Sequence, residues 1–390
     1  MDKKILVVGM GNGGSQVSNL CEKKYSSIMD CVYINTSAAD LEMVSGSMKF
    51  KIGETDEVEG SGMNRLRMKN YLRGELPKIL QDENFLNMCR GKRYIFVIAT
   101  AAGGTGSGGA PAFMSVLKGC FPDTNLVLVG ILPHIQTSLM AHGNSIEFLE
   151  ELYETMDDDT TYMIYDNETM SHLSPTNCLE EVNNAIVEDI KIISGIDNFP
   201  TPYDSIDEAD METIVSTPGR LHITRVTKDL TEKTLEDISI DDIIIKTIKK
   251  SCHAETDRNK KVERWGIITH FTNEVNDLYV SKFEKLTDFI GTPKERFNHH
   301  SINPHSEDKN FLYLIASGLS PINDRVKKIK TRINELKDAL AKDEASKYIL
   351  SSDNEDSSSY SASAMRKKEK LLESQDDEIE VMDIFNKFMK

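Results

Sequence analysis

A glycine-rich segment directly follows a run of apolar residues in this chain. Residues 94–99 read Tyr-Ile-Phe-Val-Ile-Ala, which is typical of a buried parallel strand. Residues 101–111 then contain five glycines together with Thr105 and Ser107. Pro111 indicates the first turns of a helix. A strand, a glycine loop and a helix N-terminus in this order commonly hold a phosphate, because backbone N–H groups and the helix dipole both attract an anion.

The glycine loop contains no lysine, so it differs from the GxxxxGK[ST] loop of P-loop proteins. An ordinary glycine turn without a ligand is the alternative interpretation. Five glycines and two hydroxyl residues within residues 103–109 make that alternative the less favoured one. The segment therefore indicates an α/β fold with a phosphate-binding loop.

A second glycine loop follows another short strand. Residues 5–8 are apolar, and residues 9–14 match the GxGxxG fingerprint of dinucleotide-binding folds. A dehydrogenase of that kind needs an acidic residue after the second strand to hold the ribose hydroxyl. Residues 31–34, the second strand, are instead followed by Asn35 and Thr36. A nicotinamide-dependent oxidoreductase remains an alternative, whereas two glycine loops after two parallel strands favour a nucleoside triphosphate.

Composition restricts the class of protein further. A chain of 390 residues can bury a large core and is expected to form about two domains. Its formal net charge of −17 argues against a general nucleic-acid-binding surface. The six cysteines show no CxxC spacing, so neither a zinc site nor a disulfide framework is indicated. With no signal peptide and no apolar run long enough for a membrane span, we expect a cytoplasmic protein without membrane insertion.

Residues 102–108 read Ala-Gly-Gly-Thr-Gly-Ser-Gly. This resembles the GGGTG[ST]G signature of the tubulin and FtsZ superfamily of GTPases, with Ala102 in place of the first glycine. The resemblance covers roughly the first two hundred residues. It implies an α/β fold with an N-terminal nucleotide-binding domain built on a doubly wound, mostly parallel sheet, a long central helix and a smaller α/β C-terminal domain. It also implies GTP as substrate and Mg²⁺ as cofactor.

The resemblance further implies contacts to each part of GTP. Asn12 would lie on the phosphate and magnesium side, and Gln16, one helical turn later, would face the guanine. Residues 60–64 resemble the loop that senses the γ-phosphate, with an ordinary turn as the alternative, and Pro133 would lie near the ribose. The implied GTP-binding residues are Gly11, Asn12, Gly13, Gly14, Gln16, Asn35, Gly60, Ser61, Gly62, Met63, Asn64, Ala102, Gly103, Gly104, Thr105, Gly106, Ser107, Gly108, Pro133, Asn167 and Asn183.

The resemblance implies that two of these asparagines contact the guanine base. Asn167 belongs to an Asp-Asn-Glu triplet after a strand, and Asn183 lies in residues 178–194, where apolar residues recur at helical spacing. A side-chain amide can meet both the donors and the acceptor of guanine. Leu179 stands where the family has an aromatic residue that stacks on the base. For any residue of this helix, simple packing is the alternative.

An acidic segment follows the central helix. The resemblance implies that Asp207 and Asp210 are catalytic, with Ser205 in place of an asparagine. In the family, such acids act on the γ-phosphate bound by the next subunit of a head-to-tail homopolymer, where they position the attacking water. The alternative is a solvated acidic turn that caps a helix. We assign no residue of the chain as a metal ligand.

We expect five regions. Residues 1–177 are the GTP-binding domain, 178–204 the central helix and its connection, and 205–320 a C-terminal activation domain. Within the last, residues 221–226, 265–271 and 311–317 are expected strands, and 242–250 an expected helix. His299, His300 and His305 are expected to be exposed loop residues that bind no metal.

The C-terminal part is expected to be a long charged helix over 321–350 and a flexible tail over 351–390. The tail contains a basic segment and then an amphipathic one, as in a docking site for another protein. This design is most similar to the TubZ branch, in which a filament engages a DNA-bound adaptor protein to partition plasmid or phage DNA. An FtsZ-like division protein and a phage spindle tubulin are the alternatives within the family, and a non-hydrolysing structural polymer is a further one.

Overall fold

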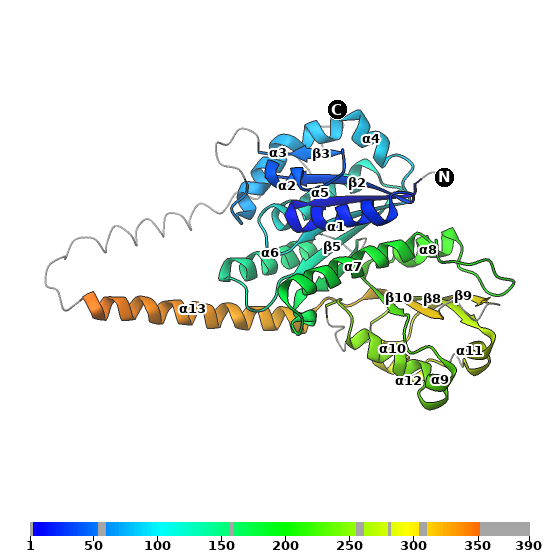
Figure 1. Ribbon diagram of the computed structural model, residues 1–390. Helices are drawn as coiled ribbons and strands as arrows, with labels where there is room; N and C mark the ends of the chain where they lie inside the picture. Colours follow the sequence, from blue (N-terminus) through cyan, green and yellow to red (C-terminus); the bar gives the residue numbers. More distant parts are fainter. Residues whose placement is uncertain are drawn as a thin grey trace. The chain divides into compact units, whose positions relative to one another are not determined.

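The computed structural model describes residues 3–53, 60–155, 160–254, 261–279, 282–303 and 310–351 (Figure 1). The chain divides into two compact units, Met1–Lys330 and Thr331–Lys390. The strands are β1 (Ile5–Met10), β2 (Met29–Asn35), β3 (Lys49–Lys51), β4 (Tyr94–Thr100), β5 (Asn125–Leu132), β6 (Thr161–Asp166), β7 (Gly219–Val226), β8 (Arg264–Thr272), β9 (Glu295–Asn303) and β10 (Phe311–Leu319).

The helices are α1 (Gly11–Tyr25), α2 (Ala38–Glu42), α3 (Arg65–Gln81), α4 (Glu83–Cys89), α5 (Thr105–Cys120), α6 (Leu139–Thr155), η1 (Asn167–Met170), α7 (Pro175–Ile193), α8 (Glu208–Val215), α9 (Glu232–Asp237), α10 (Ile240–Lys249), α11 (Asn273–Leu278), α12 (Glu284–Ile290) and α13 (Asn323–Ser351). Strands and helices alternate from β1 to β7, which is the order that produces a parallel sheet.

The described strands form one continuous sheet in the order β3-β2-β1-β4-β5-β6-β7-β10-β8-β9. Neighbours from β3 to β7 are parallel, and only β10 runs antiparallel to its neighbours β7 and β8. Strands β6 and β7 pair only through Thr161 with Gly219 and Tyr162 with Arg220. This short pairing joins the first half of the sheet, from β3 to β6, to the second half, so the strands of both halves share one sheet.

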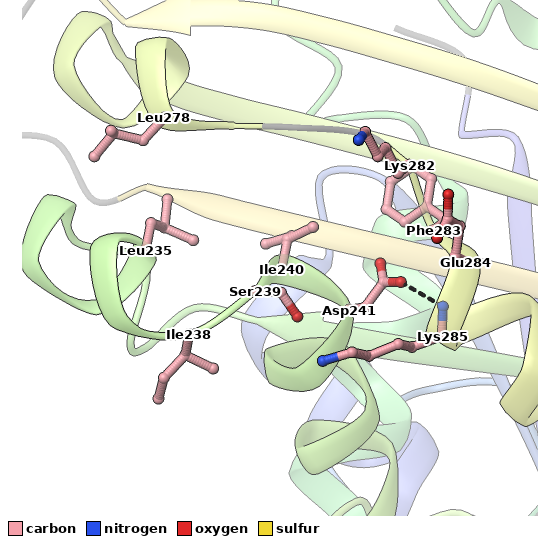
Figure 2. A pocket seen from close by; sticks show the side chains of 10 residues that line it. All are labelled: Leu235, Ile238, Ser239, Ile240, Asp241, Leu278, Lys282, Phe283, Glu284 and Lys285. Atoms are coloured by element: carbon pink, nitrogen blue, oxygen red, sulfur yellow. Dashed lines mark hydrogen bonds between the residues drawn. The ribbon is translucent and has the colours of Figure 1, made fainter.

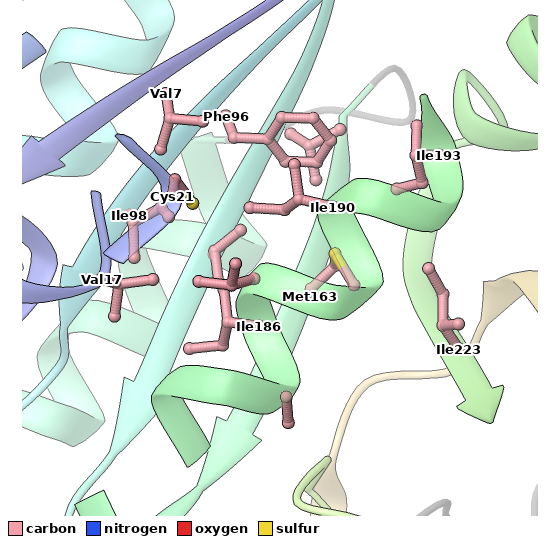
Figure 3. Close-up of a cluster of buried hydrophobic side chains, with 14 of the residues drawn as sticks. Val7, Val17, Cys21, Phe96, Ile98, Met163, Ile186, Ile190, Ile193 and Ile223 are labelled. Carbon is pink, nitrogen blue, oxygen red and sulfur yellow. The ribbon is translucent and has the colours of Figure 1, made fainter. Parts of the chain in front are cut away.

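The sheet is covered on both faces, which confirms the doubly wound α/β class. Ile5 and Val7 of β1 belong to a core with α1 and α7, whereas Leu6 and Val8 belong to a second core with α3, α5 and α6. Figure 3 shows side chains of α1 and α7 packed against strand residues on the first face, with Ile186 reaching toward the strands. Both faces of these strands are buried, which explains why their sequences are continuously apolar.

Helix α7 is the central helix. Ser174 accepts a hydrogen bond from the backbone of Asn177, and Pro175 occupies the first helical position, so the start is well capped. The helix ends at Ile193, and Gly195, the residue after its C-cap Ser194, has a φ of 73° that favours glycine. The buried residues of α7 include Val182, Ile186, Val187, Ile190 and Ile193. Helix α7 therefore begins three residues before the predicted apolar repeat.

Helix α5 begins earlier than its proline indicates. The glycine segment is itself helical from Thr105, and Pro111 lies inside the helix. Close packing explains this: a Cβ on Gly106 would lie 2.8 Å from the Met10 carbonyl oxygen, and one on Gly108 would lie 2.7 Å from the Arg65 carbonyl oxygen. Glycine in these turns allows the helix to approach its neighbours, at the cost of weaker helix propensity.

The expected strands and helix of the second half are present as β7, β8, β10 and α10. Residues 352–390, and with them the basic and amphipathic segments of the tail, lie outside the described residues, as does His305. Among the residues that the structure describes, no helix is both long and apolar enough to cross a bilayer.

Candidate nucleotide-binding site

Two helix N-termini meet at one edge of the sheet. Helix α1 starts directly after β1, and α5 starts a few residues after β4, the parallel neighbour of β1. Their backbones touch, since a Cβ on Gly11 would lie 3.0 Å from the Gly106 nitrogen. Gly11 also has a φ of 71°. Both predicted glycine loops therefore lie on one surface at the carboxyl ends of the strands, where open α/β sheets bind ligands.

The electrostatics of this surface favour an anion. Among the described residues, neither Met10 before α1 nor Gly104 before α5 caps its helix with a side chain, and neither first turn contains an acid. By contrast, Ser37, Asn64 and Ser174 cap α2, α3 and α7. The first N–H groups of α1 and α5 therefore lack these internal acceptors, and the two helix dipoles add positive potential at the same place.

The third predicted loop lies against the start of α5. A Cβ on Gly104 would lie 2.4 Å from the Ser61 hydroxyl oxygen and 2.7 Å from the Asn64 nitrogen. The Thr105 hydroxyl bonds the hydroxyls of Ser61 at 3.1 Å and Thr36 at 2.8 Å, and all three residues are buried. The loop needs its unusual backbone, with φ of 84° at Gly60, 59° at Gly62 and 61° at Met63.

Two residues that the sequence did not single out hold these loops together. The amide of buried Asn144, on α6, donates to the carbonyl oxygens of Met63 and Ala102 at 2.9 Å and of Gly103 at 3.2 Å. Buried Arg65 in turn donates to the Asn144 carbonyl oxygen at 3.2 Å. A single amide therefore sets the spacing between the 60–64 loop and the glycine loop before α5. No local motif marks Asn144, because its partners lie far away in sequence.

Other predicted residues occupy the surroundings of the same edge. Asn12 is exposed at the start of α1, and the Gln16 amide donates to its side-chain oxygen at 3.5 Å. Asn35 is buried at the end of β2, where it donates to Asp40 at 3.1 Å and accepts from the Thr36 nitrogen at 2.8 Å. The Asn35 side chain therefore shapes the turn after β2. The remaining predicted glycines of this edge, Gly13 and Gly14, pack against β4.

Pro133 and Asn167 both lie next to a buried ion pair. Arg325, from the first turn of α13, contacts the Asp166 carboxylate at 2.6 Å and donates to the Pro133 carbonyl oxygen at 2.7 Å. Burial raises the pKa of Asp166, and Arg325 opposes that rise. Asp166 also caps η1, in which Asn167 is the first residue. One arginine thus ties together the loop after β5 and the turn after β6, and the sequence had not singled it out.

Asn183 and Leu179 lie on α7, as predicted, with Asn183 half-buried and Leu179 51% exposed. An exposed leucine of this size on a helix that is otherwise well packed leaves apolar surface for a ligand ring. Among the described residues, no hydrogen bond joins either residue to the glycine loops, so their contact to a base stays a prediction.

The predicted catalytic acids lie elsewhere. Asp207 caps α8 and accepts from the Ala209 and Asp210 nitrogens, while Asp210 accepts from the Asp207 nitrogen at 3.1 Å. This is a capping box, so the alternative interpretation of a helix-capping turn describes the local structure correctly. Asp207 is exposed and Asp210 is half-buried.

Helix α8 is tied to the edge of the sheet opposite the glycine loops. Glu208 forms ion pairs with Lys4 and, at 2.6 Å, with Arg93. Lys4 immediately precedes β1, and Arg93 immediately precedes β4. The hydrogen bond from Lys4 lowers the pKa of Glu208. Since six residues of β1 span roughly 20 Å, the acids and the glycine loops lie at opposite ends of the same strands.

The expectation that His299 and His300 are exposed loop residues is wrong. Both lie on β9, where His299 is 4% exposed and His300 is half-buried. Strand β9 pairs with β8, and desolvation lowers the pKa of both rings. The His-Asn-rich sequence hid the strand because its residues have low strand propensity. In the part of the chain that the structure describes, no group of three or more His, Cys, Asp or Glu residues could hold a metal ion.

A separate hollow of about 310 Å³ lies in the second half (Figure 2). Apolar side chains of α9, α10 and α11 surround it together with Phe283. Asp241 accepts from the Lys285 nitrogen at 2.8 Å and so caps α12 from a neighbouring helix. The hollow includes none of the residues that the sequence predicts to bind GTP.

Comparison with known proteins agrees with this geometry. Residues 4–175 match the family described as Tubulin/FtsZ family, GTPase domain. These residues form a tubulin/FtsZ GTPase domain. The chain therefore contains a tubulin/FtsZ GTPase domain, and the dehydrogenase alternative is set aside.

One relative and two solved structures are similar to this chain over most of its length. The chain is 23% identical to the tubulin-like protein TubZ of Clostridium botulinum C phage over 100% of both chains. The crystal structure of Clostridium botulinum phage c-st TubZ aligns with a TM-score of 0.69 and 19% identity, covering 87% of this chain and 100% of that one. A GTPγS-form protofilament of Bacillus thuringiensis serovar israelensis TubZ aligns with a TM-score of 0.66 and 16% identity, over 88% and 94% of the two chains.

Proposed function

We propose that this tubulin-like GTPase forms head-to-tail filaments and hydrolyses GTP at the junction between subunits. The placement of the two halves of the predicted site carries the proposal. The phosphate-binding surface follows β1 and β4, whereas Glu208, next to Asp207, is paired with the residues that precede these strands. Within one subunit, the acids lie too far from the glycine loops to act there. Stacking subunits along the strand direction would bring the acids of one to the GTP of the next.

The chemistry suits hydrolysis at such a junction. Phosphoryl transfer to water needs an oriented water and neutralised phosphate charge, with little covalent work by the protein. Asp207 and Asp210 each use one carboxylate oxygen in the capping box, which leaves the other oxygen to bind a water. The N–H groups of α1 and α5 would supply part of the neutralisation.

Mg²⁺ would supply the rest when bound with GTP. Mg²⁺ usually takes most of its ligands from phosphates and water, and needs few from the protein. The donors at the glycine loops fit this requirement, since Asn12 offers an exposed amide oxygen and Thr36, Ser61 and Thr105 offer hydroxyl oxygens. The predicted GTP contacts of Gly11, Gly103 and the other loop residues belong to the same proposal.

We further propose that the filament partitions plasmid or phage DNA in the cytoplasm. Similarity to phage TubZ over the full length of both chains supports this role over a division role. The TubZ protofilament from Bacillus thuringiensis supports self-association. The tail over 351–390 would bind a DNA-bound adaptor protein, and its segments lie outside the described residues.

Light scattering and phosphate release after addition of GTP, ATP or NAD test the biochemical part. GTP alone should produce both assembly and phosphate release. Asp210→Asn keeps an oxygen that can accept from the Asp207 nitrogen but removes the charge, so its filaments should assemble and persist with phosphate release nearly abolished. Asp204→Asn is the matched control, because this exposed acid lies in the same segment outside the capping box. Normal hydrolysis by the Asp210 variant would contradict the assignment.

A further inference from the structure

His299 joins the second half of the sheet to the segment that leads to the predicted catalytic acids. The ring is buried on β9 and bonds the segment at two points. The Ile206 nitrogen donates to His299 Nδ1 at 3.3 Å, and His299 Nε2 donates to the Phe199 carbonyl oxygen at 2.9 Å. Ile206 immediately precedes Asp207, the cap of α8. The first of these bonds therefore fixes the backbone next to the acids.

Only one form of the ring can make both bonds. A backbone N–H only donates and a carbonyl oxygen only accepts, so Nδ1 must carry a lone pair and Nε2 a hydrogen. This is the neutral ring. Burial lowers the pKa of His299, and the bond to the Phe199 carbonyl opposes that shift. The ring is thus held in the form that its two partners require.

The segment depends on such contacts because it has no regular structure. Residues 196–207 form neither helix nor strand in the described structure. The Asn198 amide donates to the Ile206 carbonyl oxygen at 3.1 Å, and the Asp204 carbonyl oxygen accepts from the His300 nitrogen at 3.0 Å. Phe199 stacks on His270 with ring centroids 4.3 Å apart. The His299 side chain contacts Phe199 near the beginning of this segment and Ile206 near its end.

We propose that His299 is a positioning residue for GTP hydrolysis: it sets the place of Asp207 and Asp210 relative to the nucleotide of the neighbouring subunit. This proposal rests on the proposed function. A displacement of the acids by about 1 Å can cost roughly 100-fold in rate. Nucleotide binding should be unaffected, because the glycine loops lie at the other edge of the sheet.

Three variants separate the two hydrogen bonds. His299→Asn places an amide oxygen where Nδ1 lies and so keeps an acceptor for Ile206. His299→Gln reaches the Nε2 position and keeps only the donor to Phe199, while His299→Ala loses both. His300→Gln is the matched control, because the His300 ring bonds Thr269 and Asn276 rather than the backbone of the segment. Each full-length variant is assayed for GTP affinity, assembly and phosphate release per filament subunit.

The Ala and Gln variants should lose at least about tenfold in phosphate release at unchanged GTP affinity, and the Asn variant and the His300 control should stay within about threefold of wild type. Equal loss in the Asn and Gln variants, or an Ala variant within twofold of wild type, would overturn the proposal. If the Ala variant does not fold, the difference between Asn and Gln decides. Wild-type hydrolysis that is independent of assembly would instead contradict the proposed function, so the two failures are distinguishable.

Discussion

The ion pair between Arg325 and Asp166 gives a quantitative prediction. Both side chains are almost fully buried, at 3% and 4% exposure, and their shortest contact is 2.6 Å. Arg325→Met fills the volume of the aliphatic stem but leaves a buried carboxylate without its cation. Removing one partner of a buried pair costs about 3–5 kcal/mol. We therefore expect a loss of that size in the free energy of unfolding, measured by urea denaturation at pH 7.5.

The double variant Arg325→Met/Asp166→Asn tests the cause. Asparagine keeps the oxygen that accepts from the Glu168 nitrogen and removes the charge. The double variant should be more stable than Arg325→Met, with a coupling energy of at least about 2 kcal/mol. Burial already raises the pKa of Asp166, and loss of the cation should raise it further, so the deficit of Arg325→Met should shrink as the pH falls.

Arg332→Met is the control for this series. Arg332 lies on the same helix and pairs at 2.9 Å with Glu335, but both are partly exposed, so the change should stay within about 0.5 kcal/mol. GTP affinity should fall in Arg325→Met but not in Arg332→Met, because the loss of Arg325 removes a common anchor of Pro133 and Asn167. A loss below 1 kcal/mol in Arg325→Met, or no coupling with Asp166, would refute the reasoning.

Three further predictions follow from single residues. Gly14→Ala places a Cβ 2.1 Å from the Ile98 carbonyl oxygen, so Tm should fall by several degrees and GTP affinity should drop. The control is Gly143→Ala, whose Cβ would have no described atom within 4 Å. It should leave GTP affinity unchanged and leave Tm unchanged or slightly raised. Leu179→Phe should strengthen GTP binding several-fold in calorimetry, since an aromatic ring at this exposed position could stack on the base; unchanged affinity would remove Leu179 from the site. Burial lowers the pKa of His222 well below 6.5, so the unfolded chain binds more protons below that pH. Tm should therefore fall as the pH drops from 7.5 through 6.5, and His222→Gln should show a smaller fall than wild type.

The sequence predicts the strands and the glycine loops well because both depend on local patterns. Continuous apolar runs marked β1, β4 and β5, and the glycines that follow are required by backbone contacts at Gly11 and Gly106. The start of α5 was missed because glycine has low helix propensity, and tertiary packing overrides that propensity here. Tertiary packing also outweighs the low strand propensity of the residues around His299 and His300, which lie on β9.

Residues that act across the fold left no local signal. Asn144 bonds carbonyl oxygens of residues that lie 41, 42 and 81 positions away in sequence. Arg325 bonds Asp166 and Pro133 at separations of 159 and 192 residues. A surface arginine in a charged helix is the default interpretation of such a residue. Only the three-dimensional contacts reveal that Arg325 is buried and bonds Asp166 and Pro133, which is one of the predicted GTP-binding residues.

Mixing two inactive variants tests the shared site most directly. Asp207→Asn/Asp210→Asn lacks the acids but keeps the nucleotide surface. Gly104→Val lacks a functional nucleotide surface, because its Cβ would lie 2.4 Å from the Ser61 hydroxyl oxygen, but keeps the acids. Each variant alone should release almost no phosphate from GTP, and the mixture should recover activity where one subunit supplies the acids to the GTP of the other. A mixture that co-assembles and stays inactive, or normal hydrolysis by the variant without acids, would contradict the account.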